Sequence, residues 1–189
     1  QKRWAIQRTL QQQKAQEAAA RAAQPIDVAA RLETMLIGES LKNLSIRNLH
    51  PGMRYDQAKA VLEQNWKYKS DMGIDLSKKF FSVTRSDMAN YTKIDRRDGG
   101  YVELGTMERK VGQIKFTEHY TGPLDANAAR AWLVEHFGQP DKEQTAAVGR
   151  MMAWRNDSAR LQVKVANQVE EPSRKHNYKR TLSFALWSQ

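Results

Sequence analysis

One helix-like stretch occurs twice in this chain, and the repeat limits the folds that are open to it. Residues 58–66 (Ala-Lys-Ala-Val-Leu-Glu-Gln-Asn-Trp) align with residues 129–137 (Ala-Arg-Ala-Trp-Leu-Val-Glu-His-Phe) at a shift of 71 positions, with three identical residues. The last position is aromatic in both copies, Trp66 and Phe137. Apolar residues recur at helical spacing in each copy, and residues that favour strands follow each one. We therefore expect two consecutive helix-plus-strand units of one type.

Alternation of apolar and polar residues predicts three strands after each helix. The first helix is expected at about 54–67 and its strands at 80–85, 101–105 and 111–120; the second helix is expected at 126–137 and its strands at 151–155, 160–166 and 181–187. The polar segments 68–79 and 86–100 are expected to be loops. Alternation with period two leaves one face of a sheet buried and one wet, which is the antiparallel pattern, so the helices must cover the apolar face. The sequence thus predicts the α+β class, with an N-terminal helical extension followed by two tandem helix-plus-three-stranded antiparallel sheet units, whose sheets either join or stay separate.

The boundaries of these parts follow from composition. Residues 1–25 are expected to form a helical or flexible extension, 26–121 the first helix/sheet unit and 122–189 the second. The extension is rich in Gln, Ala and Arg, which favour helix, but it has few apolar residues to bury. It is either a solvated helix or linker, or else a spacer from a membrane anchor or a helix that docks on a partner. A further amphipathic helix is expected at 27–37, with Asp27 as its N-cap.

The charge of the chain leaves two interpretations. The net charge is +10 and the pI about 9.9. This balance indicates either an anionic partner or a scattered basic surface that maintains solubility.

The absence of cysteine excludes disulfides, thiolate zinc sites and cysteine nucleophiles. No apolar run reaches the roughly 20 residues of a membrane helix. The chain starts at Gln1 without Met, which leaves open a leader or an anchor upstream.

Two short motifs resemble a known family. Residues 49–58 (Leu-His-Pro-Gly-Met-Arg-Tyr-Asp-Gln-Ala) resemble the Gly-Met-x-x-x-Gln-Val opening of the SmpA/OmlA (BamE) envelope lipoproteins, and Phe-Gly-Gln-Pro at 137–140 resembles their Leu-Gly-x-Pro ending. The beta-lactamase inhibitor proteins are built from similar tandem helix-plus-sheet units. The motifs are split between the copies, since the first lacks Gly-x-Pro and the second lacks Gly-Met. The resemblance implies a non-enzymatic envelope protein that binds other proteins.

No catalytic, cofactor or metal site is predicted. The four histidines, His50, His119, His136 and His176, form no pair at helical metal-ligand spacing. The neighbouring carboxylates of the predicted loops lie among basic residues and indicate solvated charge rather than an acid/base pair. We therefore expect neither an enzyme nor a cofactor. Trp132, Trp154 and Trp187 are expected to belong to the core rather than to form ligand platforms.

Partner-binding residues are predicted in two basic segments: Arg96, Arg97, Arg174, Lys175, Tyr178, Lys179 and Arg180. The favoured partner is another protein, either an envelope component or an inhibited enzyme. The protein would then be an assembly or scaffold factor, or an inhibitor or immunity protein, periplasmic or membrane-anchored facing the periplasm. Its concave sheet surface and the loops around 86–100 and 167–180 would cover the partner. The alternative is a nucleic-acid or anionic-membrane binder that uses the basic loop 174–180 and the N-terminal arm.

Overall fold

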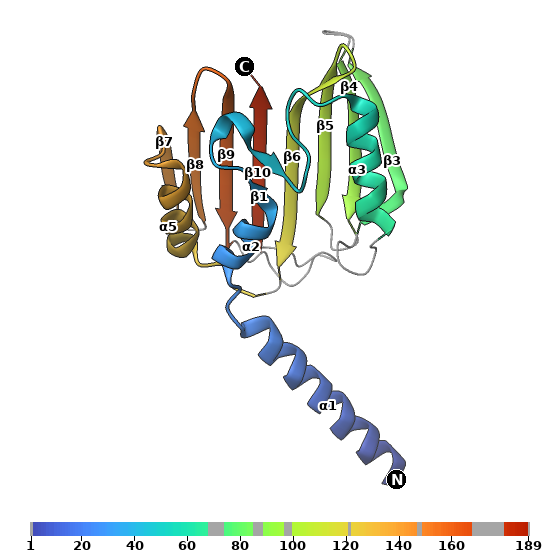
Figure 1. The fold of residues 1–189 in the computed structure, drawn as a ribbon. Coiled ribbons are helices and arrows are strands. Elements are labelled where there is room, and N and C mark those ends of the chain that lie inside the picture. Colours follow the sequence, from blue (N-terminus) through green and yellow to red (C-terminus); the bar gives the residue numbers. More distant parts are fainter. Residues whose placement is uncertain are drawn as a thin grey trace.

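The computed structural model of the protein describes residues 2–67, 74–84, 89–96, 100–120, 122–146, 149–167 and 180–188. Its first part contains helices and one small hairpin: α1 (Lys2–Ala23), α2 (Val28–Met35), β1 (Leu36–Ile37), the 3-10 turn η1 (Leu41–Asn43), β2 (Ser45–Ile46) and α3 (Tyr55–Lys67). Helix α1 extends away from the rest of the molecule (Figure 1). Its few apolar side chains are exposed, Trp4 by 72%. The predicted N-terminal extension is therefore a helix.

Eight antiparallel strands form one sheet. They are β3 (Ile74–Thr84), β4 (Ala89–Arg96), β5 (Tyr101–Met107), β6 (Lys110–Tyr120), β7 (Lys142–Ala146), β8 (Gly149–Arg155), β9 (Ala159–Ala166) and β10 (Arg180–Ser188), and α5 (Ala126–Phe137) lies between β6 and β7 in the sequence. The strand order is β3-β4-β5-β6-β10-β9-β8-β7. The described part of the chain is therefore a mixed α+β protein, as predicted.

The prediction of three strands after each helix is wrong. Strand β4 occupies most of the polar segment 86–100, and β3 begins at Ile74 inside the predicted loop 68–79. Strand β7, between α5 and β8, was not predicted at all. Both β4 and β7 are polar in sequence, and backbone pairing with neighbours makes them strands: β4 pairs with β3 and β5, and β7 pairs with β8. Strand propensity depends on such context more than on the sequence itself.

The helix ends follow the capping residues in the sequence. The Asp27 carboxylate accepts a hydrogen bond from the Ala30 N–H, and Asp125 accepts from the N–H groups of Asn127 and Ala128. These bonds satisfy amide groups that have no partner within the helix. Helix α5 ends at Gly138, whose φ of 77° is easily adopted without a side chain. The predicted helices at 27–37, 54–67 and 126–137 are confirmed, although α2 stops at Met35.

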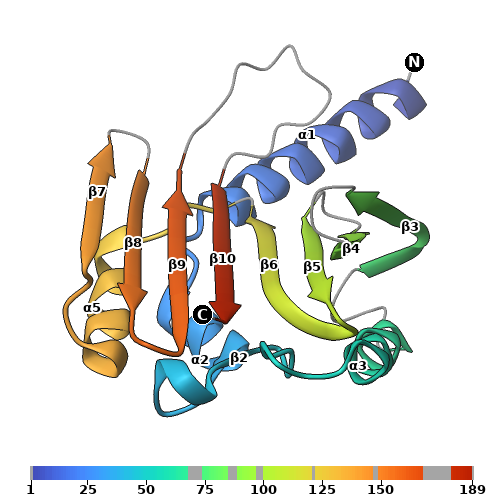
Figure 2. The same ribbon diagram turned by 90° about the horizontal axis from the view of Figure 1, so that it is seen from above.

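Helices α2, α3 and α5 all lie on the same face of the sheet (Figures 1 and 2). Helix α5 contacts β8 and β9, α3 contacts β3 and β6, and α2 packs on α5. Between these helices and the sheet is the core, in which Leu32, Ile114, Phe116, Leu133 and Phe184 are fully or almost fully buried. The helices cover the apolar face, as the alternation requires.

The two halves of the sheet meet at β6 and β10. These strands pair over eight positions, from Arg180 opposite Tyr120 to Trp187 opposite Gln113. The rings of Phe116 and Phe184 face each other across this pair, with centroids 6.5 Å apart. Figure 2 shows the sheet bent, with β3 and β4 turned away from the helices. The face without helices is therefore the inner side of the bend.

Candidate protein-binding surface

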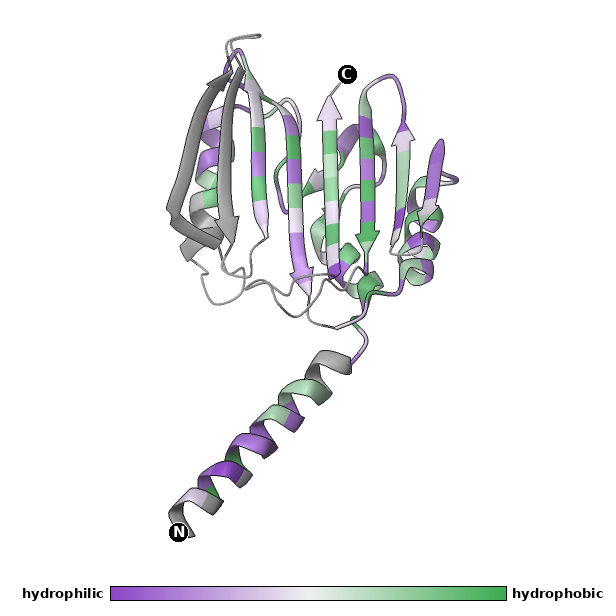
Figure 3. Ribbon diagram, turned by 180° about the vertical axis from the view of Figure 1, so that it is seen from behind, coloured by the Kyte–Doolittle hydropathy of each residue, from purple (hydrophilic) through white to green (hydrophobic). Residues whose placement is uncertain are grey.

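The face of the sheet opposite the helices is open over its central strands (Figure 3). We call the outward-facing side chains of β5, β6, β7, β8, β9 and β10 on this side the open face. Along β10 it contains Thr181, Ser183, Ala185 and Trp187, which alternate with the buried Leu182, Phe184 and Leu186. Since side chains of paired residues point to the same side of a sheet, the strand register gives the rest of the open face.

The residues of the open face lie in rows that cross the strands. One row runs Tyr101, Thr117, Ser183, Lys164 and Met151 from β5 to β8. The next runs Glu103, Lys115, Ala185, Gln162, Ala153 and Lys142 from β5 to β7. A third runs Gln113, Trp187, Arg160 and Arg155 from β6 to β8. Long and aromatic residues thus surround small ones at the centre of the face, on β10.

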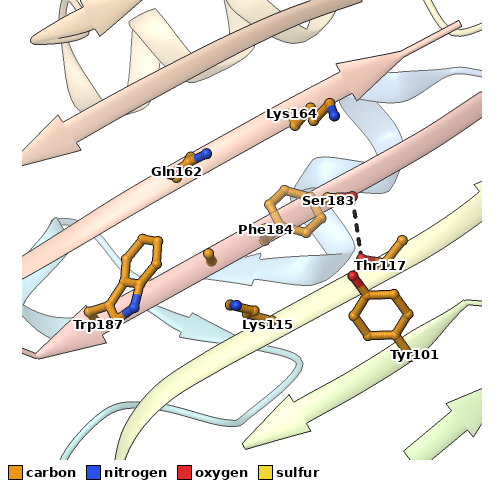
Figure 4. A pocket seen from close by; sticks show the side chains of 9 residues that line it. Tyr101, Lys115, Thr117, Gln162, Lys164, Ser183, Phe184 and Trp187 are labelled. Carbon is orange, nitrogen blue, oxygen red and sulfur yellow. Dashed lines mark hydrogen bonds between the residues drawn. The ribbon is translucent and has the colours of Figure 1, made fainter. Parts of the chain in front are cut away.

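A hollow of about 330 Å³ lies at this centre. It is lined by Tyr101, Lys115, Thr117, Gln162, Lys164, Ser183, Phe184, Ala185 and Trp187. In Figure 4, Tyr101 and Trp187 stand at opposite ends, and Lys115 and Lys164 lie on the two sides of β10. Because Ala185 and Ser183 are short, the surface is low between the longer side chains. The four strands β5, β6, β9 and β10 together form this hollow, which below is called the central hollow.

Polar groups at the bottom of the central hollow are partly paired. The Thr117 hydroxyl donates to the Ser183 oxygen at 3.3 Å (Figure 4). The Ser183 hydroxyl, which has one hydrogen and two lone pairs, keeps its own hydrogen for another acceptor. The Gln162 amide donates to the Met151 sulfur at 2.9 Å. In the part of the chain that the structure describes, no carboxylate lies within ion-pair distance of Lys115 or Lys164.

Trp187 belongs to this open face and not to the core. It is half-buried, and the Arg160 guanidinium lies over its ring at 5.2 Å from the centroid. The expectation that Trp187 is a core residue is therefore wrong. Trp154 is buried, and its indole N–H donates to the Gly138 carbonyl, so that expectation is confirmed. Trp132 packs at the edge of the core and stacks on His136.

The open face is basic. Its charged residues with described side chains are Glu103, Lys115, Lys142, Arg155, Arg160 and Lys164. Five of these six are cations, in keeping with the charge of the whole chain. A basic concave surface attracts acidic partners and raises their rate of association.

Most of the predicted partner-binding residues cannot be placed. Arg97, Arg174, Lys175, Tyr178 and Lys179 lie outside the described residues. Arg96 ends β4, opposite Ile74. Arg180 begins β10 opposite Tyr120, and alternation puts it on the side of Leu182 and Phe184, the face that the helices cover. Arg180 is therefore not part of the open face, and the side chain of Arg96 lies outside the described ones.

A polar cluster lies on the covered face. The Arg47 guanidinium is 3.6 Å from the Glu118 carboxylate and also lies over the Phe116 ring. The Arg31 guanidinium lies over the ring of Tyr120. Burial raises the pKa of the Tyr120 phenol well above its ordinary value, the charge of Glu118 raises it further, and Arg31 opposes the shift. These groups fasten the segment of α2 and β2 to the end of β6.

Among the described residues, no group of three His, Asp or Glu side chains is placed to hold a metal ion. His119 is on the open side of β6, whereas His136 contacts the carbonyl of Trp132 in its own helix.

In the part of the chain that the structure describes, no helix has the length and apolar character needed to cross a membrane. Comparisons of the chain with protein-family models, curated proteins and solved structures found no match.

Proposed function

We propose that this chain is a non-enzymatic protein-binding module of a bacterial envelope, which binds an acidic surface of another protein through the open face. The observation that carries the proposal is the division of the sheet into a face covered by α2, α3 and α5 and a basic, bent face with half-buried aromatic residues. Arginine and aromatic side chains are enriched where proteins bind each other. The module would act as an assembly factor or as an inhibitor that covers the partner's functional site.

The topology supports the resemblance to tandem helix-plus-sheet proteins. Helix α3 precedes β3 to β6, and α5 precedes β7 to β10. The order β3-β4-β5-β6 meets β10-β9-β8-β7, so the last strand of each series is central and the first is at an edge. We infer that these are two units of four strands related by an approximate two-fold axis. Such an arrangement joins two short sheets into a surface wide enough for a protein partner.

The envelope location rests on the resemblance of residues 49–58 and 137–140 to the SmpA/OmlA (BamE) lipoproteins. These motifs are a turn and a helix stop. The N–H of Gly52 donates to the Val111 carbonyl, and Val111 donates to the Met53 carbonyl, so the Gly-Met segment holds α3 against the β5–β6 hairpin. In this proposal the motif has a structural role, and binding belongs to the sheet.

Nucleic acid is the second candidate partner. Tyr101 and Trp187 flank the central hollow, and basic residues surround it. Single strands are bound by such combinations of stacking platforms and cations. Protein is favoured because Glu103 interrupts the basic row beside Lys115, where a polyanion would meet a like charge.

The test is capture from bacterial envelope and cytosolic extracts by tagged protein after nuclease treatment. The binding variant combines Trp187→Ala with Lys164→Glu on the open face. The matched control is Lys42→Glu, which changes the charge of an exposed lysine in η1. We expect one envelope protein to be retained by the wild type and the control and lost by the binding variant, and to bind again when both proteins are purified.

Three other results would contradict the proposal. Equal retention by all three forms would place the contact away from the open face. Capture of nucleic acid alone from untreated extract, lost at high salt, would move the function to the second candidate. Retention of no purified partner by any form would leave the open face without the proposed role.

A further inference from the structure

The central hollow has the chemistry of a binding site for a negatively charged group. The side chains of Lys115 and Lys164 lie on the two sides of β10, and Ser183 of β10 has a hydroxyl hydrogen available. Among the residues that the structure describes, no acidic one lines the hollow. Glu103 is the cross-strand partner of Lys115 on β5, outside the lining. The charged side chains that line the hollow are therefore the two lysines.

We propose that the central hollow holds one carboxylate side chain, an aspartate or glutamate of the partner protein. Rings of Tyr101 and Trp187 cover the aliphatic part of the side chain, and Lys115, Lys164 and Ser183 donate to its two oxygens. Charge-assisted hydrogen bonds of this kind are roughly twice as strong as neutral ones. This inference rests on the proposed function for the source of the carboxylate.

The hollow makes the contact stronger than an ordinary surface ion pair. Exposed pairs contribute little because water screens them and the side chains lose freedom. Here the partner that covers the open face would exclude water from the bound carboxylate, with Tyr101 and Trp187 at the two ends, which lowers the local dielectric and strengthens each bond. Anchors in such central pockets, surrounded by residues that keep water out, carry most of the energy of an interface.

A carboxylate can use all the donors of the hollow. Lys115, Lys164 and Ser183 provide three donor groups, and the two oxygens of a carboxylate offer about four acceptor positions. Arg160 is not counted among these donors, because its guanidinium lies over Trp187.

The inference is tested with glutamate blocked at both ends (N-acetyl, N-methylamide) as the probe, by following backbone amide NMR shifts of the labelled protein at low salt. We expect saturable shifts at Ser183, Ala185 and Lys164. Blocked glutamine, which has the same shape without the charge, should give none. Replacing both lysines (Lys115→Gln with Lys164→Gln) should weaken binding about tenfold or more.

Two more variants separate the hollow from the general charge of the face. Lys142→Gln removes one cation from the same face, at edge strand β7 outside the lining, and should change the affinity by less than about twofold. Ala185→Leu keeps every charge and fills the hollow, so it should abolish binding. Equal shifts with blocked glutamine, equal weakening by Lys142→Gln, or full binding by Ala185→Leu would each overturn the inference.

This experiment can fail separately from the capture experiment. If the partner is captured through the open face while blocked glutamate does not bind, the inference is overturned and the proposed function stands. If blocked glutamate binds in the hollow while no partner is captured, the carboxylate site stands and the proposed function is overturned.

Discussion

The guanidinium of Arg47 lies 3.6 Å from the carboxylate of Glu118, on the side of the sheet that the helices cover. Among the described residues, Glu118 is the one charged residue that is buried, and it lies opposite the apolar Leu182 on the neighbouring strand. A buried charge is tolerated only with a partner, because leaving water costs several kcal/mol. Arg47 therefore links the β2 turn to the sheet by an interaction that is costly to break from one side.

Removing one member of this pair should destabilise the protein strongly. Glu118→Gln leaves the Arg47 guanidinium without its carboxylate, and we expect a loss of about 3 kcal/mol in the free energy of unfolding, measured by urea titration. Arg47→Met should have a similar cost, since it removes the cation that accompanies the buried carboxylate. The double variant should cost less than the sum of the two. Additive losses would show that the two side chains do not interact.

Stability should fall with rising pH in a way that depends on Tyr120. Burial keeps the Tyr120 phenol neutral in the folded protein, whereas an unfolded tyrosine ionises near pH 10. The contribution of Tyr120 to the free energy of unfolding is fully present below about pH 10. Above that pH it is lost, by up to about 1.4 kcal/mol per pH unit, because only the unfolded state releases the proton. Unfolding free energies of wild type and Tyr120→Phe between about pH 9 and 11 should diverge accordingly. Parallel curves would contradict a raised pKa.

The elements that could be predicted from the sequence are those whose structure depends on their own side chains. Asp27 marked the start of α2 through capping chemistry that acts within a few residues. Strands with one buried face showed their alternation. Strand β7 did not, because all five of its residues are exposed and only pairing with β8 makes it a strand.

The candidate surface was only partly predictable. Charged segments attract attention in a sequence, yet the central hollow combines residues of four strands, and its members Tyr101 and Trp187 are far apart in the chain. Their proximity depends on the pairing of β6 with β10, which no local pattern specifies. One signal was available: if Leu182, Phe184 and Leu186 face the core, Trp187 must face outward.

The turn between β5 and β6 is strained, and relieving that strain should raise the free energy of unfolding. Glu108 and Arg109 connect β5 to β6 with φ values of 50° and 64°, a conformation that favours Asn-Gly. The Arg109 carbonyl accepts from the Tyr55 N–H, which helps to hold the turn in place. Glu108→Asn with Arg109→Gly should stabilise the protein by about 1 kcal/mol, measured by urea titration. Glycine at the adjacent strand position, Met107→Gly, should instead destabilise it, and the same sign for both would refute the role of backbone strain.

The pairing of β6 with β10 should make the two halves of the sheet unfold together. Phe116 and Phe184 are buried opposite each other at this seam, so Phe184→Ala leaves a cavity that borders both halves and should cost about 3–5 kcal/mol. The loss should appear equally in the indole N–H NMR signal of Trp154, in the second half, and in the amide signal of Leu104, in the first. The exposed Met107→Ala is the control and should change neither midpoint. If Phe184→Ala shifted the Trp154 midpoint and left that of Leu104 unchanged, the halves would be independent units that only share an edge.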